Sequence, residues 1–195
     1  MIDLNSLKQI YTFGKELSLS DIKILFKSAK KLSFEKRELL INEGTKENKM
    51  FFIIKGLVRC YFINDKGEEI TFSLIPENYP VVNADMILYN QPSRFYYEAL
   101  EPTVTYANNF NVVDELAAKY PKLEANRKHL FRRFMRESMN RVESFVLLSP
   151  EERYLQFIKD YPSLNNRVQD KYIANTLGMT PVSLSRIRKR IASKK

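Results

Sequence analysis

The sequence predicts an α+β protein in which an antiparallel β domain precedes a long helix and a final group of short helices. Three observations support this order. Short apolar runs alternate with turns, three of which contain glycine, from about residue 31 to residue 108. Residues 122–148 contain no glycine or proline, and new helix start and stop signals follow. We therefore predict three domains, over residues 1–110, 111–148 and 149–195.

The composition is that of a folded protein outside the membrane. Apolar residues make up 44% of the 195-residue chain, and no apolar run reaches the roughly 18–20 residues that a membrane-spanning helix needs. The first five residues do not begin a basic stretch followed by an apolar one, as a secretory leader would. We expect a soluble, cytoplasmic protein with no membrane partner.

Residue patterns that indicate catalysis or metal binding are missing from the sequence. Cys60 and His129 are the only cysteine and histidine, and the chain contains no Ser/His/Asp or Cys/His set and no Gly-rich phosphate loop. We therefore predict no enzyme activity, no cofactor and no metal site. Cys60 is expected to be a small buried apolar residue, with a redox-sensing thiol as the alternative.

The positive charge is concentrated in two segments. The net charge is +9, and residues 151–195 contain ten Lys and Arg against four Asp and Glu. Residues 122–141 contain seven Lys and Arg against two acids. The last ten residues contain six basic side chains and no acid, which indicates a polyanion as the partner of this end.

One helix and a series of short strands are expected in the first domain. Ser20 should cap a helix over residues 21–27, because its hydroxyl accepts hydrogen bonds from first-turn N–H groups. Strands are expected at residues 38–41, 50–54, 57–63, 69–74, 94–100 and 103–108. Turns at Gly44, Gly56 and Gly67 separate the first of these, a spacing typical of an antiparallel sandwich or small barrel.

A long helix is expected over residues 122–148, after a shorter one over residues 112–120 that Pro121 stops. Apolar residues recur along one side of it at alternating spacings of four and three: Phe131, Met135, Ser138 or Met139, Val142, and Phe145 or Val146. A helix of this length extends for about 40 Å, more than a small domain needs. We expect this stripe to pair with the same helix of a second copy, with packing on its own chain as the alternative.

The C-terminal domain has the pattern of a helix-turn-helix. Residues 149–152 predict the start of a helix that ends before Pro162. A short helix over residues 169–176 precedes Gly178, where a turn with positive φ is expected. Thr180 then caps a second helix that opens with proline. A generic pair of helices is the alternative, and the basic C-terminal residues favour the DNA-binding motif.

The second helix combines an apolar inner face with a polar and basic outer face. Leu184, Ile187 and Ile191 are expected to face inward. The residues predicted to contact double-stranded DNA are Thr180, Pro181, Val182, Ser183, Ser185, Arg186, Arg188, Lys189 and Arg190. The major groove, about 12 Å wide, accepts a helix, and the fork of Arg186 suits O6 and N7 of a guanine. Arg188, Lys194 and Lys195 are expected to act mainly on phosphates.

These residues resemble a known family. Residues 173–188, with Thr-Pro at 180–181 and Leu-Ser-Arg at 184–186, closely resemble the helix-turn-helix of Crp/Fnr-type regulators. The turns and strands at residues 43–44, 51–59 and 65–69 resemble those of a cyclic-nucleotide-binding-type domain.

The resemblance covers nearly the whole chain in the right order. It implies a β-roll, or double-stranded β-helix, as the sensor domain at residues 1–110. It further implies a transcription regulator that binds an inverted-repeat operator as a homodimer through residues 122–148. RNA polymerase is a candidate partner on the same ground.

The effector site departs from the family members that bind cyclic AMP. In those members a Gly-Glu-Leu turn and an Arg-Ser or Arg-Thr pair hold the ribose and the cyclic phosphate. Here residues 74–84 lack the glycine, and Ser93-Arg94 reverses the order of the pair. We expect an unidentified effector other than cyclic AMP, or none. The candidate pocket residues are Glu77, Asn78, Ser93 and Arg94.

A function of another class also fits the charge distribution. A ligand-binding sensor could use the basic C-terminal segment to dock on a protein or on an anionic membrane surface. A retardation assay on pooled genomic fragments separates this alternative from a DNA-binding regulator, because only the regulator retains DNA at moderate salt as a dimer.

Overall fold

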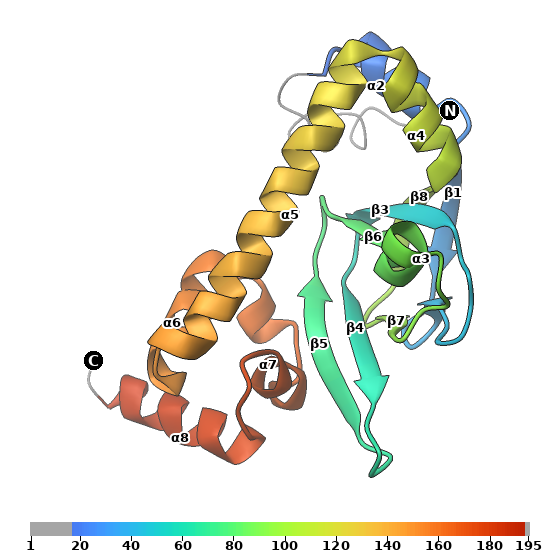
Figure 1. Cartoon of the computed structure of the whole chain (residues 1–195). Helices are drawn as coiled ribbons and strands as arrows, with labels where there is room; N and C mark the ends of the chain where they lie inside the picture. The colour runs from blue at the N-terminus through green and yellow to red at the C-terminus, as the bar shows by residue number, and fades with distance from the viewer. Residues whose placement is uncertain (1–16, 194–195) are drawn as a thin grey trace. The chain divides into compact units, whose positions relative to one another are not determined.

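The computed structural model describes residues 17–193 (Figure 1). The described chain divides into two compact units, residues 17–62 with 74–132 and residues 63–73 with 133–193. Antiparallel strands dominate the first unit and helices the second, which confirms the predicted α+β class. The N-terminal residues tested for a leader, and Lys194 and Lys195, lie outside the described residues.

The strands form two four-stranded sheets. The order is β1-β8-β3-β6 in one sheet and β2-β7-β4-β5 in the other. The strands are β1 Lys30–Phe34, β2 Leu39–Ile41, β3 Lys49–Lys55, β4 Val58–Ile63, β5 Glu69–Ile75, β6 Pro80–Val82, β7 Tyr96–Ala99 and β8 Thr103–Asn109. All the described pairings are antiparallel, and β1 pairs with the distant β8 so that Lys30 lies opposite Ala107. The six predicted strands are confirmed, whereas β1 and β6 were not predicted.

The β core is built from side chains that alternate along the strands. Its fully buried members come from both sheets: Ile53, Val58, Val81 and Ala99. Cys60 lies in this core with 3% of its surface exposed, as expected for a small apolar residue. The described geometry therefore favours the structural over the redox interpretation of this thiol.

The turn between β3 and β4 requires glycine at position 56. Gly56 has φ +107°, and a Cβ atom there would lie 2.4 Å from Thr103 Oγ1 and 2.7 Å from the Cα of Thr103. A side chain is excluded by both the backbone conformation and the close approach of β8.

Helices cover a second apolar cluster in the first unit. They are α2 Leu19–Phe26 and α4 Phe110–Lys119, whereas the short helix α3 Ala84–Tyr89 contributes no residue to this cluster. Ile22 and Phe26 of α2 pack with Phe52 of β3. The predicted cap of the first helix was wrong. Ser18 rather than Ser20 is the N-cap, because Asp21 completes a reciprocal capping box with Ser18.

The long helix α5 spans Pro121–Leu147, close to its predicted bounds. The preceding helix ends at Lys119 with Tyr120 as its C-cap, and proline occupies the first position of α5. Leu123 is the only residue of this 27-residue helix that is buried in the single chain. Most of its apolar stripe therefore remains exposed.

Short helices form the main part of the second unit. They are α6 Pro150–Asp160, the 3-10 helix η1 Leu164–Asn166, α7 Asp170–Thr176 and α8 Pro181–Ala192. The predicted capping box of Ser149 and Glu152 is confirmed. The strand segment of this unit contacts α7, since Thr71 N–H donates to Asn175 Oδ1 at 3.3 Å.

Candidate nucleic-acid interface

Helix α8 begins at a fixed point that its sequence specifies. Thr180 Oγ1 accepts from the Ser183 N–H at 3.1 Å, and Pro181 occupies the first helical position. The two hydroxyls of Thr180 and Ser183 also bond each other at 3.0 Å. This cap confirms the predicted start of the helix. The Val182 N–H is a further first-turn donor, and the Thr180 side chain does not accept from it.

The inner face of α8 packs on α7, which lies beside it in Figure 1. Leu184 and Ile187 are 0% and 5% exposed, and Ile173 of α7 is fully buried. Gly178 lies between the helices with φ +64°, the left-handed conformation predicted for this turn. These contacts set the orientation of α8 within the unit and confirm the helix-turn-helix.

The outer face of α8 presents a set of exposed polar, basic and small apolar side chains. Ser183 is half-buried, and the exposed members are Pro181, Val182, Ser185, Arg186, Lys189 and Arg190. The helix contains no Asp or Glu. The structure therefore places most of the predicted DNA-contacting residues on one accessible surface.

Arg188 has a different environment from the other basic residues of α8. Its Nε donates to the Tyr154 hydroxyl at 3.0 Å and one Nη donates to Asn165 Oδ1 at 2.9 Å. The other Nη pairs with Asp170 at 2.5 Å. All the guanidinium nitrogens thus bond side chains of α6, η1 and α7, so we interpret Arg188 as a positioning residue rather than a phosphate contact.

Arg190 also has an acidic partner within the unit. It forms an ion pair with Glu151 at the start of α6, while more than half of its side chain stays exposed. Surface ion pairs contribute little and exchange easily. Arg190 therefore stays among the residues predicted to contact DNA.

Arg153 connects the end of α5 to the helix-turn-helix. Its Nε donates to the Leu177 carbonyl at 3.0 Å and its Nη1 to the Leu148 carbonyl at 2.7 Å. The guanidinium also lies 5.1 Å from the centroid of the Phe145 ring. A cation is favourable at helix C-termini, where carbonyls lack helical partners. Sequence reasoning missed this role, because both acceptors are backbone atoms and Leu177 is 24 residues away.

The four candidate effector residues lie in two loops of the first unit. Glu77 accepts from the Gly56 N–H at 3.1 Å, and Asn78 occupies a turn with φ +68°. Ser93 is buried and its hydroxyl bonds the backbone of Phe95. Three of the four thus have roles in the local backbone structure.

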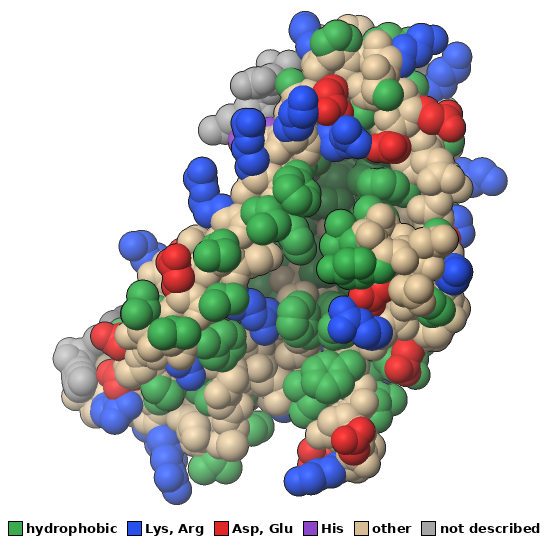
Figure 2. Space-filling view, in the orientation of Figure 1, with side chains coloured by type: hydrophobic (Ala, Val, Ile, Leu, Met, Phe, Trp, Pro, Cys, Tyr) green, Lys and Arg blue, Asp and Glu red, His purple; other side chains and the backbone are tan. Residues whose placement is uncertain are grey.

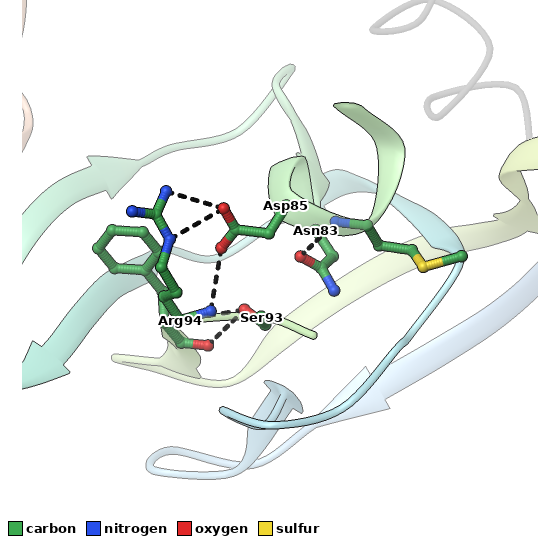
Figure 3. Close-up of polar contacts among 6 residues, drawn as sticks. Asn83, Asp85, Ser93 and Arg94 are labelled. Atoms are coloured by element: carbon green, nitrogen blue, oxygen red, sulfur yellow. Dashed lines mark hydrogen bonds and ion pairs between the residues drawn. The ribbon is translucent and has the colours of Figure 1, made fainter. Parts of the chain in front are cut away.

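The fourth candidate, Arg94, is held by a carboxylate that sequence reasoning missed. Asp85 of α3 accepts from the Arg94 backbone N–H at 3.0 Å and from its Nε and Nη2 at 3.0 and 2.8 Å, the contacts drawn as dashed lines in Figure 3. Asp85 is 7% exposed, whereas the Arg94 side chain is 74% exposed. The hydrogen bonds from Arg94 hold the pKa of the Asp85 carboxyl below its usual range.

The described residues contain neither a metal-binding cluster nor a membrane-spanning helix. No group of three or more His, Cys, Asp or Glu among them is placed to hold an ion. No helix of the described chain is long and apolar enough to cross a bilayer.

Comparison with known proteins identifies the family. Residues 31–120 match the family described as "Cyclic nucleotide-binding domain". The chain is 30% identical over 177 residues to "Electron transport regulator A" of Shewanella oneidensis, covering 81% of this chain and 67% of that protein. The chain belongs to the Crp/Fnr family of transcription regulators. Another Crp/Fnr relative, "Anaerobic regulatory protein" of Pasteurella multocida, is 29% identical over 83% of this chain.

The lengths of these Crp/Fnr relatives differ from that of the present chain. This chain spans 63% of the Pasteurella multocida protein and 65% of "Anaerobic regulatory protein" of Haemophilus influenzae. The relatives carry the names of regulatory proteins rather than enzymes.

Solved structures show that the Crp/Fnr fold is shared. FixK2 from Bradyrhizobium japonicum has a TM-score of 0.72 at 16% identity and covers 85% of both chains. TTHA1359 from Thermus thermophilus, a transcriptional regulator of the CRP/FNR family, has a TM-score of 0.68 at 14% identity, over 85% of this chain and 87% of that one. These likenesses support the β-roll, long helix and helix-turn-helix architecture.

Proposed function

We propose that this protein is a cytoplasmic transcription regulator that binds an inverted-repeat operator as a homodimer. The outer face of α8 carries this proposal, since it combines a capped N-terminus, an exposed Arg186 and further basic residues without any acid. The three functional parts are those of the sequence prediction: sensor at residues 1–110, dimer helix at 111–148 and DNA-binding domain at 149–195. RNA polymerase remains a candidate partner.

The apolar stripe of α5 supports the homodimer. Large apolar side chains between 42% and 76% exposed recur along this helix: Phe131, Phe134, Met135, Met139, Val142, Phe145, Val146 and Leu147. Figure 2 shows apolar side chains along the course of α5. Contiguous exposed apolar surface on a regular helix stripe is typical of a helix-pairing interface. A second copy supplies an identical stripe and covers the surface by two-fold symmetry.

Arg186 is the residue proposed to read a base. It is exposed on the second turn of α8, on the face that a groove would meet. Thr180, Pro181, Val182, Ser183, Ser185, Lys189 and Arg190 complete the proposed contacts to bases and phosphates. A helix N-terminus favours a phosphate through its free N–H groups and dipole.

Replacing Arg186 by alanine tests this function. We expect the free energy of binding to a selected operator to become less favourable by about 1–3 kcal/mol per half-site, the contribution of a bidentate base contact. Binding to random duplex should change far less. Lys159→Ala, which removes an exposed cation from α6, is the matched control. Fluorescence anisotropy titrations at fixed salt measure the affinity of each variant for the operator and for random duplex. If Arg186→Ala keeps the wild-type affinity and sequence preference, the assigned role is refuted.

The Asp85–Arg94 pair supports an effector other than cyclic AMP, or none. A phosphate that took the Arg94 guanidinium would displace Asp85 and leave a buried carboxylate without its charge partner, which is costly. The Arg94 backbone N–H is also engaged by Asp85. The local geometry therefore disfavours an anion at this position.

We expect cyclic AMP to leave the melting temperature of the protein unchanged up to millimolar concentrations, because a ligand stabilises only the state that binds it. AMP serves as the control for non-specific nucleotide effects. A saturable rise in melting temperature with cyclic AMP alone would overturn this part of the proposal.

A further inference from the structure

Val182 differs in its exposure from the two aliphatic residues at the centre of α8. It is 60% exposed, whereas Leu184 and Ile187 are almost completely buried. An exposed valine contributes little to the stability of the domain, and valine is not a favoured helix residue. Packing within the domain therefore does not explain a valine at this position.

Val182 lies on the same side of the helix as Arg186. Residues four apart on a helix have Cβ atoms about 5–6 Å apart. Successive base pairs of B-DNA are separated by about 3.4 Å along the axis. A helix that places the Arg186 fork on one base edge therefore brings Val182 to a base edge one or two pairs away.

The chemistry of the valine side chain limits what it can recognise. The isopropyl group neither donates nor accepts a hydrogen bond, and the 5-methyl group of thymine is the apolar feature of the major-groove edges. Opposite another base edge, the isopropyl group would remove water from a donor or acceptor of the base without replacing its hydrogen bond. The neighbouring Ser183 is half-buried with its hydroxyl bonded to Thr180, so it does not compete for this position.

We propose that Val182 is a specificity-determining residue that contacts the 5-methyl group of a thymine in each half-site. This thymine lies within two base pairs of the base that Arg186 reads. The inference rests on the proposed DNA-binding function and adds an apolar contact to the readout by Arg186.

Replacing thymine by deoxyuridine tests the contact at the level of one methyl group. Uracil keeps O4 and the pairing with adenine, so only the methyl group is removed. Each thymine of an operator selected by the wild-type protein is replaced in turn, and affinity is measured by fluorescence anisotropy at fixed salt. The pair read by Arg186 is identified as the position at which Arg186→Ala loses discrimination.

We expect one thymine within two base pairs of that position to be sensitive. Loss of one buried methyl group should weaken binding about fourfold per half-site, and about fifteenfold when both half-sites carry uracil. Val182→Ala should bind the thymine operator more weakly and should no longer distinguish uracil from thymine there. Its unfolding midpoint should match the wild type, because the side chain is exposed, and thymines outside the half-sites serve as control positions.

The outcomes separate a failure of the proposed DNA-binding function from a failure of the Val182 contact alone. If the wild-type protein does not prefer the selected operator over a scrambled duplex, the DNA-binding function itself fails, and this inference with it. If it does, but no thymine lies within two pairs of the Arg186 position, only the Val182 contact is wrong. The same holds if uracil there has no effect, or if Val182→Ala keeps the full sensitivity to uracil.

Discussion

Replacing Gly178 by alanine is expected to lower the free energy of unfolding of the second unit by about 2–4 kcal/mol. Two costs combine at this position. Gly178 has φ +64°, a conformation that costs an alanine about 1–2 kcal/mol. In addition, its Cβ would lie 2.4 Å from Cε1 of Phe145, and that ring has the Arg153 guanidinium beside it. Operator affinity should fall about tenfold or more, because this turn sets the orientation of α8.

Gly67→Ala is the matched control, because it isolates the backbone cost. Gly67 has φ +77°, but a Cβ there meets nothing within 4 Å. Chemical denaturation should therefore give a loss for Gly178→Ala that clearly exceeds that for Gly67→Ala. A Phe145→Ala background should reduce the extra cost, since the ring is then absent. Equal losses in the two single variants would show that the Phe145 contact does not constrain the turn.

Replacing Val142 by aspartate is expected to convert the dimer into a monomer. Val142 is 59% exposed in the single chain and lies in the middle of the α5 stripe. Two-fold pairing would bury a carboxylate from each copy without a charge partner, which typically costs about 3–5 kcal/mol. We expect the dimer dissociation constant to rise at least about 100-fold, and specific operator binding to be lost with it. Sedimentation equilibrium measures the first effect and anisotropy the second.

Asn140→Asp provides the matched control for this substitution. Asn140 is exposed and lies two residues from Val142, so the same charge is added on the opposite side of the helix. This variant should remain a dimer, and circular dichroism should show equal helix content for both. A wild-type protein that is monomeric at micromolar concentration, or an unchanged Val142→Asp dimer, would refute the assigned interface.

The extent to which the fold could be predicted depended on burial. Strands β2, β3, β4, β5, β7 and β8 have apolar runs bounded by turns and were predicted. Strands β1 and β6 are both edges of the first sheet. Strand β1 has no buried residue, and β6 has only three residues, of which the first is proline. Neither strand therefore shows a clear alternation of apolar and polar residues in the sequence. Helix α3, with six residues, is too short to show a helical period.

The interface could be predicted where its determinants are local. The cap, the opening proline and the inner face of α8 are all encoded within twelve residues of one another. Arg188 was assigned to phosphate because sequence shows its charge but not its partners, which lie 18 to 34 residues away. Asp85 was missed for a related reason, since no sequence period links it to Arg94. Charge and periodicity thus predict which face is exposed, but not which cations are already paired.

Sequencing the genomic fragments that the purified protein retains is the most direct test of the proposed function. We predict one enriched motif, an inverted repeat whose half-sites are centred about 34 Å, or one helical turn, apart. Its half-sites should contain a base pair at which Arg186→Ala loses preference. Retained fragments without a common motif, or with a single unrepeated element, would contradict a dimeric DNA-binding regulator.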